Sequence, residues 1–185
     1  MAKKSNRKRC PWSETHELFI PYHDEEWGKP VHDDRLLFEM LNLEGAQAGL
    51  SWLTVLKKRS SYKKAFDNFN AKKIITYKAA KKKELLNNEG IIRNRLKVDA
   101  VIANANAYLA VQKEFKSFDK FIWTFVGGKP IPFSKRSEAI KVSEVMSKDL
   151  KKRGFKFVGP TICFAYMQAT GMVNDHSPEC YLYKK

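Results

Sequence analysis

Cysteine and histidine residues form two spaced pairs near the ends of this sequence. Cys10 and His23 are separated by twelve residues near the start, and His176 and Cys180 form a His-x₃-Cys pair near the end. Two cysteines and two histidines are a ligand set that zinc takes in closed structural sites. If the two pairs meet, one zinc ion would join the N-terminal segment to the C-terminal one.

Other assignments of these residues remain open from the sequence. His16 and His32 also lie near the first pair, and nothing in the local sequence excludes either as a ligand. A scattered set of cysteines and histidines also arises by chance. Three cysteines cannot all pair within one chain, so we expect reduced thiols or a metal in a cytoplasmic protein. The third, Cys163, falls on the apolar side of an expected helix and is interpreted as a core residue.

A carboxylate interrupts an apolar helical stretch in the first third of the chain. Glu44 follows the run 36–41 at a position where the pattern would place a core residue, and Gly45 and Gly49 come next, before Trp52. Glycine inside a helix costs about 1 kcal/mol relative to alanine, so the pair indicates close approach of another backbone or a ligand. A carboxylate near an apolar face needs a partner. Glu44 is therefore the primary candidate for binding a ligand that offers N–H groups or positive charge.

Aromatic residues flank Glu44 in the sequence: Trp12, Tyr22, Trp27 and Trp52. Aromatic faces attract cations, and the attraction grows when the site is dry. The alternative is a helix that ends with an exposed Glu44 and a core Trp52. Trp27, like Trp123, is interpreted as a core residue.

Composition favours a nucleic-acid partner. Lysine and arginine total 35 against 20 acidic residues, a net charge of +15, and 43% of the 185 residues are hydrophobic. Such an excess of positive charge is typical of proteins that bind phosphate backbones. No apolar run approaches the roughly 18 residues needed to span a membrane, and the start has no secretory apolar segment. We expect a basic, mobile arm at 1–9 and a single domain at 10–185.

The pattern between the ends predicts an all-α fold. No proline occurs between residues 31 and 129, and strand-like alternation is scarce there, which favours helix after helix. The region 10–32 is rich in prolines and aromatics and is expected to be irregular. The expected helices are 33–44, 52–58, 61–69, 72–77, 80–87, a long helix with its apolar face from Ile92 to Leu109, 118–125, 137–153 and 160–170.

A glycine-containing hairpin separates the last two helices. Gly159 and Thr161 open the final helix, and Lys152 and Lys156 flank the turn. Free N–H groups at a helix start bind phosphate. The segment resembles the hairpin of a helix-hairpin-helix element at about 137–171, which docks on the DNA backbone without reading sequence. An ordinary αα-hairpin is the alternative.

Several of these motifs together resemble one known family, DNA-3-methyladenine glycosylase I. The resemblance runs from about Arg9 to Cys180 and rests on four stretches in order: Tyr22-His23-Asp24-Glu25-Glu26-Trp27-Gly28, Leu43-Glu44-Gly45-Ala46-Gln47-Ala48-Gly49-Leu50-Ser51-Trp52, Lys152-Arg153-Gly154-Phe155-Lys156-Phe157-Val158-Gly159-Pro160-Thr161 and Val173-Asn174-Asp175-His176. It implies a zinc-stapled helix-hairpin-helix enzyme that removes 3-methyladenine from alkylated double-stranded DNA and leaves an abasic site.

The resemblance also implies roles for individual residues. The zinc ligands would be Cys10, His23, His176 and Cys180, and the base would be bound by Glu44, Tyr22, Trp52 and Trp12. Leu50 is a candidate for the side chain that enters the base stack. We expect a monomer in the cytoplasm, without a membrane or an obligate protein partner.

Related helix-hairpin-helix glycosylases carry an aspartate where this chain has Asn174, and an amide cannot serve as a base. The neighbouring Asp175 is interpreted as a cap or a partner of His176. The alternative is that Asp175 is the anionic catalyst, displaced by one position. Two other functions stay open from the sequence: a non-catalytic zinc-stapled DNA-binding module and a basic RNA-binding helical protein.

Overall fold

The computed structural model describes residues 7–183, and the described chain consists of helices joined by loops. No strand forms within these residues, and one isolated bridge joins Ile131 to Val173, so the predicted all-α class is confirmed. In the same span no helix is both long and apolar enough to cross a membrane. The elements are η1 (Pro11–Glu14), α1 (Phe19–Glu25), α2 (Asp34–Gln47), α3 (Trp52–Ala65), η2 (Asp67–Phe69), α4 (Ala71–Ile74), α5 (Ala79–Asn87), α6 (Arg95–Phe115), α7 (Phe118–Ile122), η3 (Trp123–Val126), η4 (Phe133–Lys135), α8 (Arg136–Lys152) and α9 (Pro160–Ala169).

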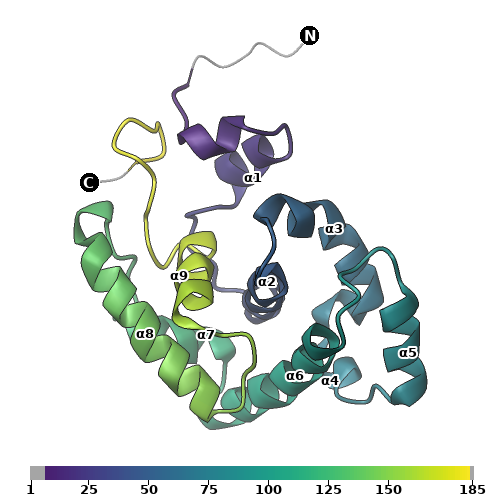
Figure 1. Cartoon of the computed structure of the whole chain (residues 1–185). Helices are drawn as coiled ribbons and strands as arrows, with labels where there is room; N and C mark the ends of the chain where they lie inside the picture. Colours follow the sequence, from purple (N-terminus) through teal and green to yellow (C-terminus); the bar gives the residue numbers. More distant parts are fainter. Residues whose placement is uncertain (1–6, 184–185) are drawn as a thin grey trace.

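Helix α2 lies at the centre of the molecule, with α3, α6, α7 and α9 packed around it (Figure 1). It begins where the Asp33 carboxylate accepts a hydrogen bond from the Leu36 amide at 2.7 Å, as an N-cap. Every residue from 37 to 46 is buried. At its other end the Lys97 ammonium donates to the carbonyls of Ala46 and Ala48, both at 2.8 Å. The helix is therefore fixed at both ends as well as along its length.

The two glycines that follow Glu44, at positions 45 and 49, are required for different physical reasons. A Cβ on Gly45 would lie 3.1 Å from the Cβ of Phe157, and 3.3 Å from its carbonyl oxygen, so the expected close backbone approach occurs there. Gly49 has open space around it but a φ of +76°, which side chains rarely adopt. The expected close approach at Gly49 is wrong: that glycine serves the turn between α2 and α3.

Helix α3 differs from expectation. The sequence pattern predicts two helices at 52–58 and 61–69, but one helix runs from Trp52 to Ala65. The residues between the expected pair, Arg59 and Ser60, contain no glycine or proline to break it. The chain turns instead at 67–69, where three consecutive residues have φ values of 49° to 55°. Left-handed backbone without glycine leaves no clear sign in a sequence.

The other boundaries shift by a few residues. The expected irregular entry holds the short 3₁₀ helix η1 and the short α-helix α1. Pro21 lies in the first turn of α1, where its missing N–H removes no hydrogen bond. The long helix begins at Arg95 because the Asn94 side chain caps it. Of the expected mobile arm, residues 1–6 lie outside the described part. Arg9 pairs with Asp24, and the Lys8 carbonyl accepts from the amide of Tyr181 at 2.9 Å, so for this part of the arm the expectation is wrong.

A buried carboxylate ties α2 to its neighbours. Glu39 is fully buried and contacts Arg35 at 3.1 Å, Arg59 at 2.8 Å and Lys63 at 3.3 Å. The Arg59 guanidinium also donates to Glu26, just after α1, at 2.5 Å. One arginine on α3 thus holds both α2 and the end of α1.

Replacing Arg59 by methionine should lower the free energy of unfolding by about 3 kcal/mol, because breaking a buried ion pair leaves a desolvated charge. Lys63→Met is the matched control: its side chain is more exposed, so we expect a loss below about 1 kcal/mol. Urea denaturation of both variants measures the difference. Equal losses would contradict this account of the Glu39 cluster.

Candidate functional site

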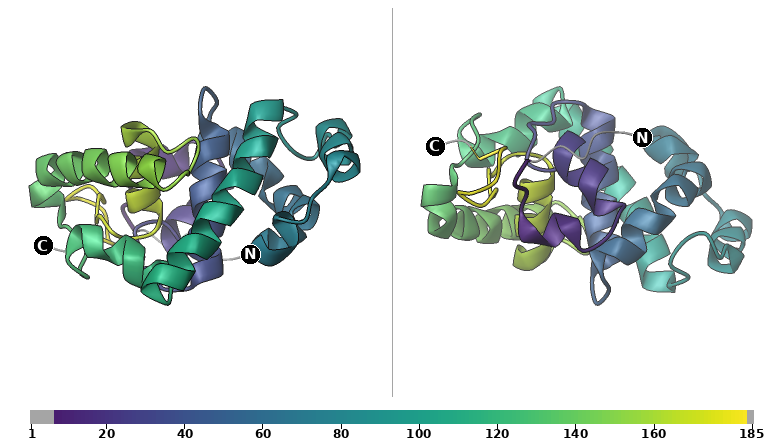
Figure 2. Two further views of the ribbon diagram at one scale, coloured as in Figure 1. Left: turned by 90° about the horizontal axis from the view of Figure 1, so that it is seen from below. Right: turned by 90° about the horizontal axis from the view of Figure 1, so that it is seen from above.

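The two Cys/His pairs from opposite ends of the chain meet in one buried cluster. Cys10 precedes η1, His23 lies in α1, and His176 and Cys180 lie in the loop after α9; all four are buried. Their ligand atoms all lie within 4.8 Å of one another. Figures 1 and 2 show the N-terminal segment and the C-terminal loop side by side. The predicted meeting of the pairs is therefore confirmed.

The other histidines near the start are engaged elsewhere. His16 accepts a hydrogen bond from the amide of Leu18. His32 stacks on Trp123 with ring centroids 4.5 Å apart and contacts Asp119 at 2.8 Å. Neither belongs to the cluster, so the sequence alternatives for the ligand set are removed.

The donor set and its spacing fit a tetrahedral metal ion. The Cys180 sulfur lies 3.4 Å from His23 Nε2 and 3.6 Å from His176 Nδ1, and Cys10 lies 3.6 Å from the same Nδ1. A tetrahedral zinc site with ordinary bond lengths separates sulfur and nitrogen by roughly 3.5 Å. Burial, with repulsion from His23, lowers the pKa of His176 to about 4. Its imidazole is neutral at physiological pH, as a metal ligand must be.

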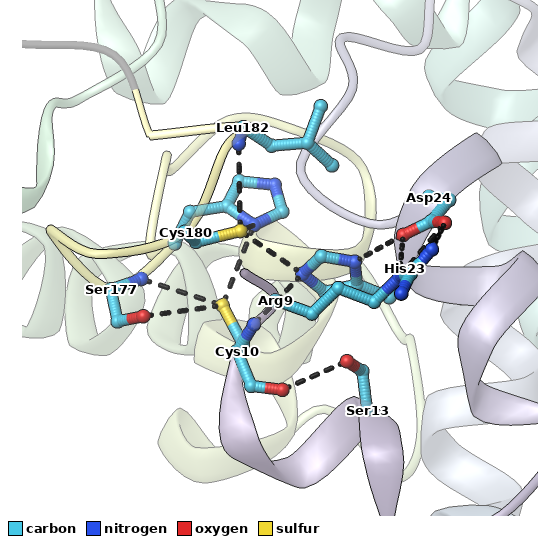
Figure 3. A network of polar contacts seen from close by, with 9 residues as sticks. Arg9, Cys10, Ser13, His23, Asp24, Ser177, Cys180 and Leu182 are labelled. Atoms are coloured by element: carbon cyan, nitrogen blue, oxygen red, sulfur yellow. Dashed lines mark hydrogen bonds and ion pairs between the residues drawn. The ribbon is translucent and has the colours of Figure 1, made fainter. Parts of the chain in front are cut away.

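Polar groups around the cluster orient its members. Figure 3 shows Arg9, Asp24 and His23 in one chain of contacts: the Asp24 carboxylate lies 2.8 Å from His23 Nδ1, and Arg9 donates to that carboxylate at 2.8 to 3.0 Å. Burial opposes ionisation of Asp24, but hydrogen bonds from Arg9 and His23 outweigh it and lower its pKa to about 2. The amides of Ser177 and Leu182 donate to the two sulfur atoms, at 3.4 and 3.5 Å. Burial raises the pKa of the Cys10 thiol, and the hydrogen bonds from Ser177 offset this only in part. The Asp24 contact fixes the orientation of the His23 ring.

Gly28, which follows Trp27 in the sequence, lies directly against the Cys/His cluster. It has a φ of +75°, and a Cβ there would lie 2.6 Å from Nε2 of His176. Any side chain at this position would displace the His176 ring. The glycine after Trp27 is therefore required by the cluster itself.

A cavity of about 170 Å³ opens beside this cluster and contains the predicted base-binding residues. It is lined by Trp12, Tyr22, Trp27, Glu44, Gln47, Trp52, Ala165 and Gln168. Glu44, Tyr22, Trp52 and Trp12 thus come together as expected. Trp27, interpreted from the sequence as core, also lines the cavity, and the sequence pattern does not single out Gln47, Ala165 or Gln168. Larger surface hollows exist, but this one alone among the cavities described contains a buried carboxylate without a partner.

Glu44 lies inside α2, not at an exposed helix end, so that alternative is wrong. The residue is 3% exposed, and its Oε2 has no hydrogen-bond partner among the described residues. Burial raises the pKa of its carboxyl to about 8. The indole Nε1 of Trp52 is likewise buried and unpartnered within the described span. One acceptor and one donor are therefore available in an aromatic cavity, and each carries an unmet hydrogen-bonding requirement.

The tryptophans connect the cavity to the metal-ligand cluster. The Trp12 ring packs edge-on against His23 with centroids 5.5 Å apart, and Trp27 packs edge-on against His176 at 4.7 Å. The two tryptophans also touch each other at 5.1 Å. Two walls of the cavity thus rest on two of the candidate metal ligands.

The predicted DNA-facing residues lie on the loops and on α8 and α9. Gly159 is the N-cap of α9 and provides no side-chain cap, so amides of the first turn remain available. Thr161, Lys152 and Lys156 are exposed around it. Leu50 is 43% exposed on the loop between α2 and α3. Asn104 accepts from the amide of Lys156 at 2.7 Å and so links the hairpin to α6.

Asp175 differs from the sequence interpretation. Its carboxylate contacts Arg136 at 3.0 Å and Gln168 at 2.5 Å, and no described hydrogen bond joins its side chain to His176. The amide of His176 donates instead to the Asn174 side chain at 3.3 Å. The expected pairing of Asp175 with His176 is therefore wrong.

Comparison with known proteins identifies the family of the chain. Residues 12–183 match the family model for methyladenine glycosylase. The chain is 50% identical to DNA-3-methyladenine glycosylase of Haemophilus influenzae over 93% of this chain and 96% of that one. It is 46% identical to DNA-3-methyladenine glycosylase 1 of Escherichia coli, over 95% and 97% of the two chains.

Solved structures give the same result. One crystal structure of a 3-methyladenine DNA glycosylase I superposes with a TM-score of 0.89 at 47% identity, covering 96% of this chain and all of that one. A second, a study of 3-methyladenine recognition by the Staphylococcus aureus enzyme, gives 0.90 at 36% identity, over 96% and 97% of the two chains. The chain therefore belongs to the methyladenine glycosylase family and is an enzyme of the DNA-3-methyladenine glycosylase I type, a hydrolase of N-glycosyl bonds.

Proposed function

We propose that this enzyme flips 3-methyladenine out of alkylated double-stranded DNA into the aromatic cavity, hydrolyses its N-glycosidic bond and leaves an abasic site. The observation that carries the proposal is the buried Glu44 carboxyl in that cavity, whose Oε2 has no hydrogen-bond partner among residues 7–183. A base inside a duplex is out of reach of such a pocket, so it must leave the stack first. The family match and the similar glycosylases support a catalytic role for this protein over a purely DNA-binding one. We also propose that the enzyme acts as a monomer in the cytoplasm.

The electrostatics of the cavity favour a cationic base. Methylation at N3 gives the adenine ring a positive charge, and aromatic faces attract cations in a dry site. A positive ring beside Glu44 would stabilise the ionised carboxylate and so lower a pKa that burial holds near 8. An undamaged, neutral base would not offset the cost of ionising this residue. The positive charge of the methylated ring therefore lets the site bind damaged bases in preference to normal ones.

The pair of unmet polar groups favours adenine over guanine. Adenine presents an amine donor beside the N7 acceptor on its major-groove edge, whereas guanine presents two acceptors there. In the proposed complex Glu44 accepts from the amine and the Trp52 indole donates to a ring nitrogen. Guanine would set its O6 lone pairs against the carboxylate. The proposal therefore includes a preference for 3-methyladenine over 3-methylguanine.

Cleavage of the glycosidic bond needs little activation of the leaving base beyond its own positive charge. The glycosidic bond of a cationic base is already weak, so binding the base in its charged form is the main task of the site. Asp175 is held by Arg136 and Gln168, which argues against a free catalytic carboxylate there. Asp175→Asn should therefore impair activity less than Glu44→Ala does.

The Glu44 proposal is tested by two substitutions. Glu44→Ala should weaken binding of free 3-methyladenine and slow base release from methylated DNA together. Losing a hydrogen bond to a charged group costs roughly 1.5–3 kcal/mol, or about one to two decades at 1.4 kcal/mol per decade. Isothermal titration and chromatography of released bases measure the two effects.

Glu44→Gln separates charge from shape. It removes an ionisable group from a dry site, so the variant should unfold no earlier than the natural chain while excising 3-methyladenine more slowly. Unchanged excision by both Glu44 variants would refute the assigned role.

We also propose that Cys10, His23, His176 and Cys180 hold one structural zinc ion. The spacing of sulfur and nitrogen atoms, the neutral His176 and the donors around the two sulfurs support this assignment. When bound, the ion would cross-link the two ends of the chain and take no part in bond cleavage. Because Trp12 and Trp27 rest on the histidines, it would also stiffen the cavity.

Elemental analysis should find about one zinc per chain. Cys180→Ala should lower the melting temperature, because structural zinc contributes directly to folding. Base affinity should fall as well, through the displaced tryptophans. Cys163→Ala is the matched control: this buried cysteine lies outside the cluster, so zinc content should not change. Absence of zinc from freshly purified, unchelated protein would overturn the assignment.

The hairpin between α8 and α9 is proposed as the region that binds the DNA backbone, acting as a helix-hairpin-helix element. Uncapped amides at the start of α9 suit a phosphate, and Lys152 and Lys156 add positive charge beside them. Leu50, exposed on the loop that follows α2, is the candidate to fill the gap left by the flipped base.

Reversing the charge of Lys152 and Lys156 together should weaken binding to damaged and undamaged duplex alike. The slope of log affinity against log salt should become shallower by about 2, because each lysine is expected to neutralise one phosphate. Lys78→Glu with Lys83→Glu, at α5 on the opposite side of the molecule from α8 (Figure 1), is the charge-matched control. An equal effect of the control pair, or a loss of free-base binding by the hairpin pair, would contradict this docking.

A further inference from the structure

Gln168 is the polar residue of α9 that faces the base cavity. It lines the cavity together with Glu44 and the aromatic residues. Its backbone is fixed as well, because the Gln168 carbonyl accepts from the amide of Gly28 at 3.0 Å. The side-chain Nε2 lies 2.5 Å from an oxygen of Asp175. Asp175 is not among the residues that line the cavity.

The Asp175 carboxylate is held from its other side. Its side chain is 9% exposed, and Arg136 Nε lies 3.0 and 3.2 Å from its two oxygens. The Arg136 guanidinium in turn lies over the Phe164 ring, 5.1 Å from its centroid. Arg136, Asp175 and Gln168 therefore form a chain of fixed contacts that ends at the cavity wall.

The contacts of Asp175 determine which polar atom of the Gln168 side-chain amide is left without a partner. A carboxylate only accepts hydrogen bonds, so the group that Gln168 turns toward Asp175 must be its NH₂. The remaining polar atom is the carbonyl Oε1, which has no hydrogen bond to any residue between 7 and 183. The cavity thus receives a second acceptor, on the α9 side, in addition to Glu44 on α2.

We propose that Gln168 is a second base-recognition residue, whose carbonyl accepts an N–H of the base, and that Asp175 is the positioning residue that fixes its orientation. The inference rests on the proposed function, since 3-methyladenine is the ligand that offers the N–H groups. Two acceptors from different helices, α2 and α9, suit the two hydrogens of an exocyclic amine. A base that presents a carbonyl at that edge would meet like charge on both sides.

A double-mutant cycle on free-base binding tests the inference. Gln168→Met keeps the shape and removes the acceptor, so the Kd for 3-methyladenine should rise about tenfold, the upper range for one neutral hydrogen bond. Asp175→Asn should have a similar effect, because an amide at 175 lets Gln168 turn a donor toward the cavity. In the Gln168→Met background Asp175→Asn should add nothing.

Gln112→Met is the matched control. Gln112 donates to the Asp34 carboxylate at 2.6 Å, an equivalent amide–carboxylate bond away from the cavity, so this variant should lose stability but bind the base normally. Zinc content is measured for each variant, because Asp175 precedes a candidate ligand. A further loss from Asp175→Asn on top of Gln168→Met would overturn the positioning role, and a normal Kd for Gln168→Met would overturn the recognition role. Failure of the natural chain to bind 3-methyladenine would instead refute the proposed function.

Discussion

The site depends on a carboxylate buried without a partner among the described residues. Glu44 lies on the central helix, 3% exposed, and burial alone raises the pKa of its carboxyl to about 8. Left to itself such a group destabilises the fold. It persists because α2 is fixed by the Lys97 contacts at its C-terminal end and by the ion pairs of Glu39 in its middle. That fixed helix keeps the carboxyl buried in the cavity wall, where the proposed cationic base would supply hydrogen bonds and positive charge.

The remaining walls of the cavity come from segments far apart in the sequence. Trp12 and Tyr22 belong to the N-terminal segment, Trp52 begins α3, and Gln168 lies near the end of the last helix. The buried Cys/His cluster joins the N-terminal segment to the loop that follows the last helix, and its two histidines support tryptophan rings. The proposed metal binding and the proposed base recognition would therefore be mechanically connected, although no cluster atom takes part in the proposed chemistry.

The sequence predicts the all-α class and the residues whose types stand out from their surroundings. Glu44 interrupts an apolar run, and the Cys/His pairs lie at opposite ends of the chain, so both can be singled out without a structure. Trp27 is misassigned to the core because a tryptophan that lines a cavity and one that fills a core look alike in sequence. Gln168 lies in an ordinary helical pattern, and its role depends on Asp175, seven residues later, being held by Arg136. Tertiary contacts of that kind leave no local signal.

The most direct test is the pH dependence of kcat/KM for release of 3-methyladenine from methylated DNA, compared between the natural chain and Glu44→Gln. This quantity reports the ionisation of the free enzyme. Because the ionised carboxylate is the form that binds a cationic base, kcat/KM should rise with pH toward a plateau with a midpoint near 8, the pKa that burial gives Glu44, and the rise should be absent in Glu44→Gln. Identical profiles for the two proteins would contradict the account.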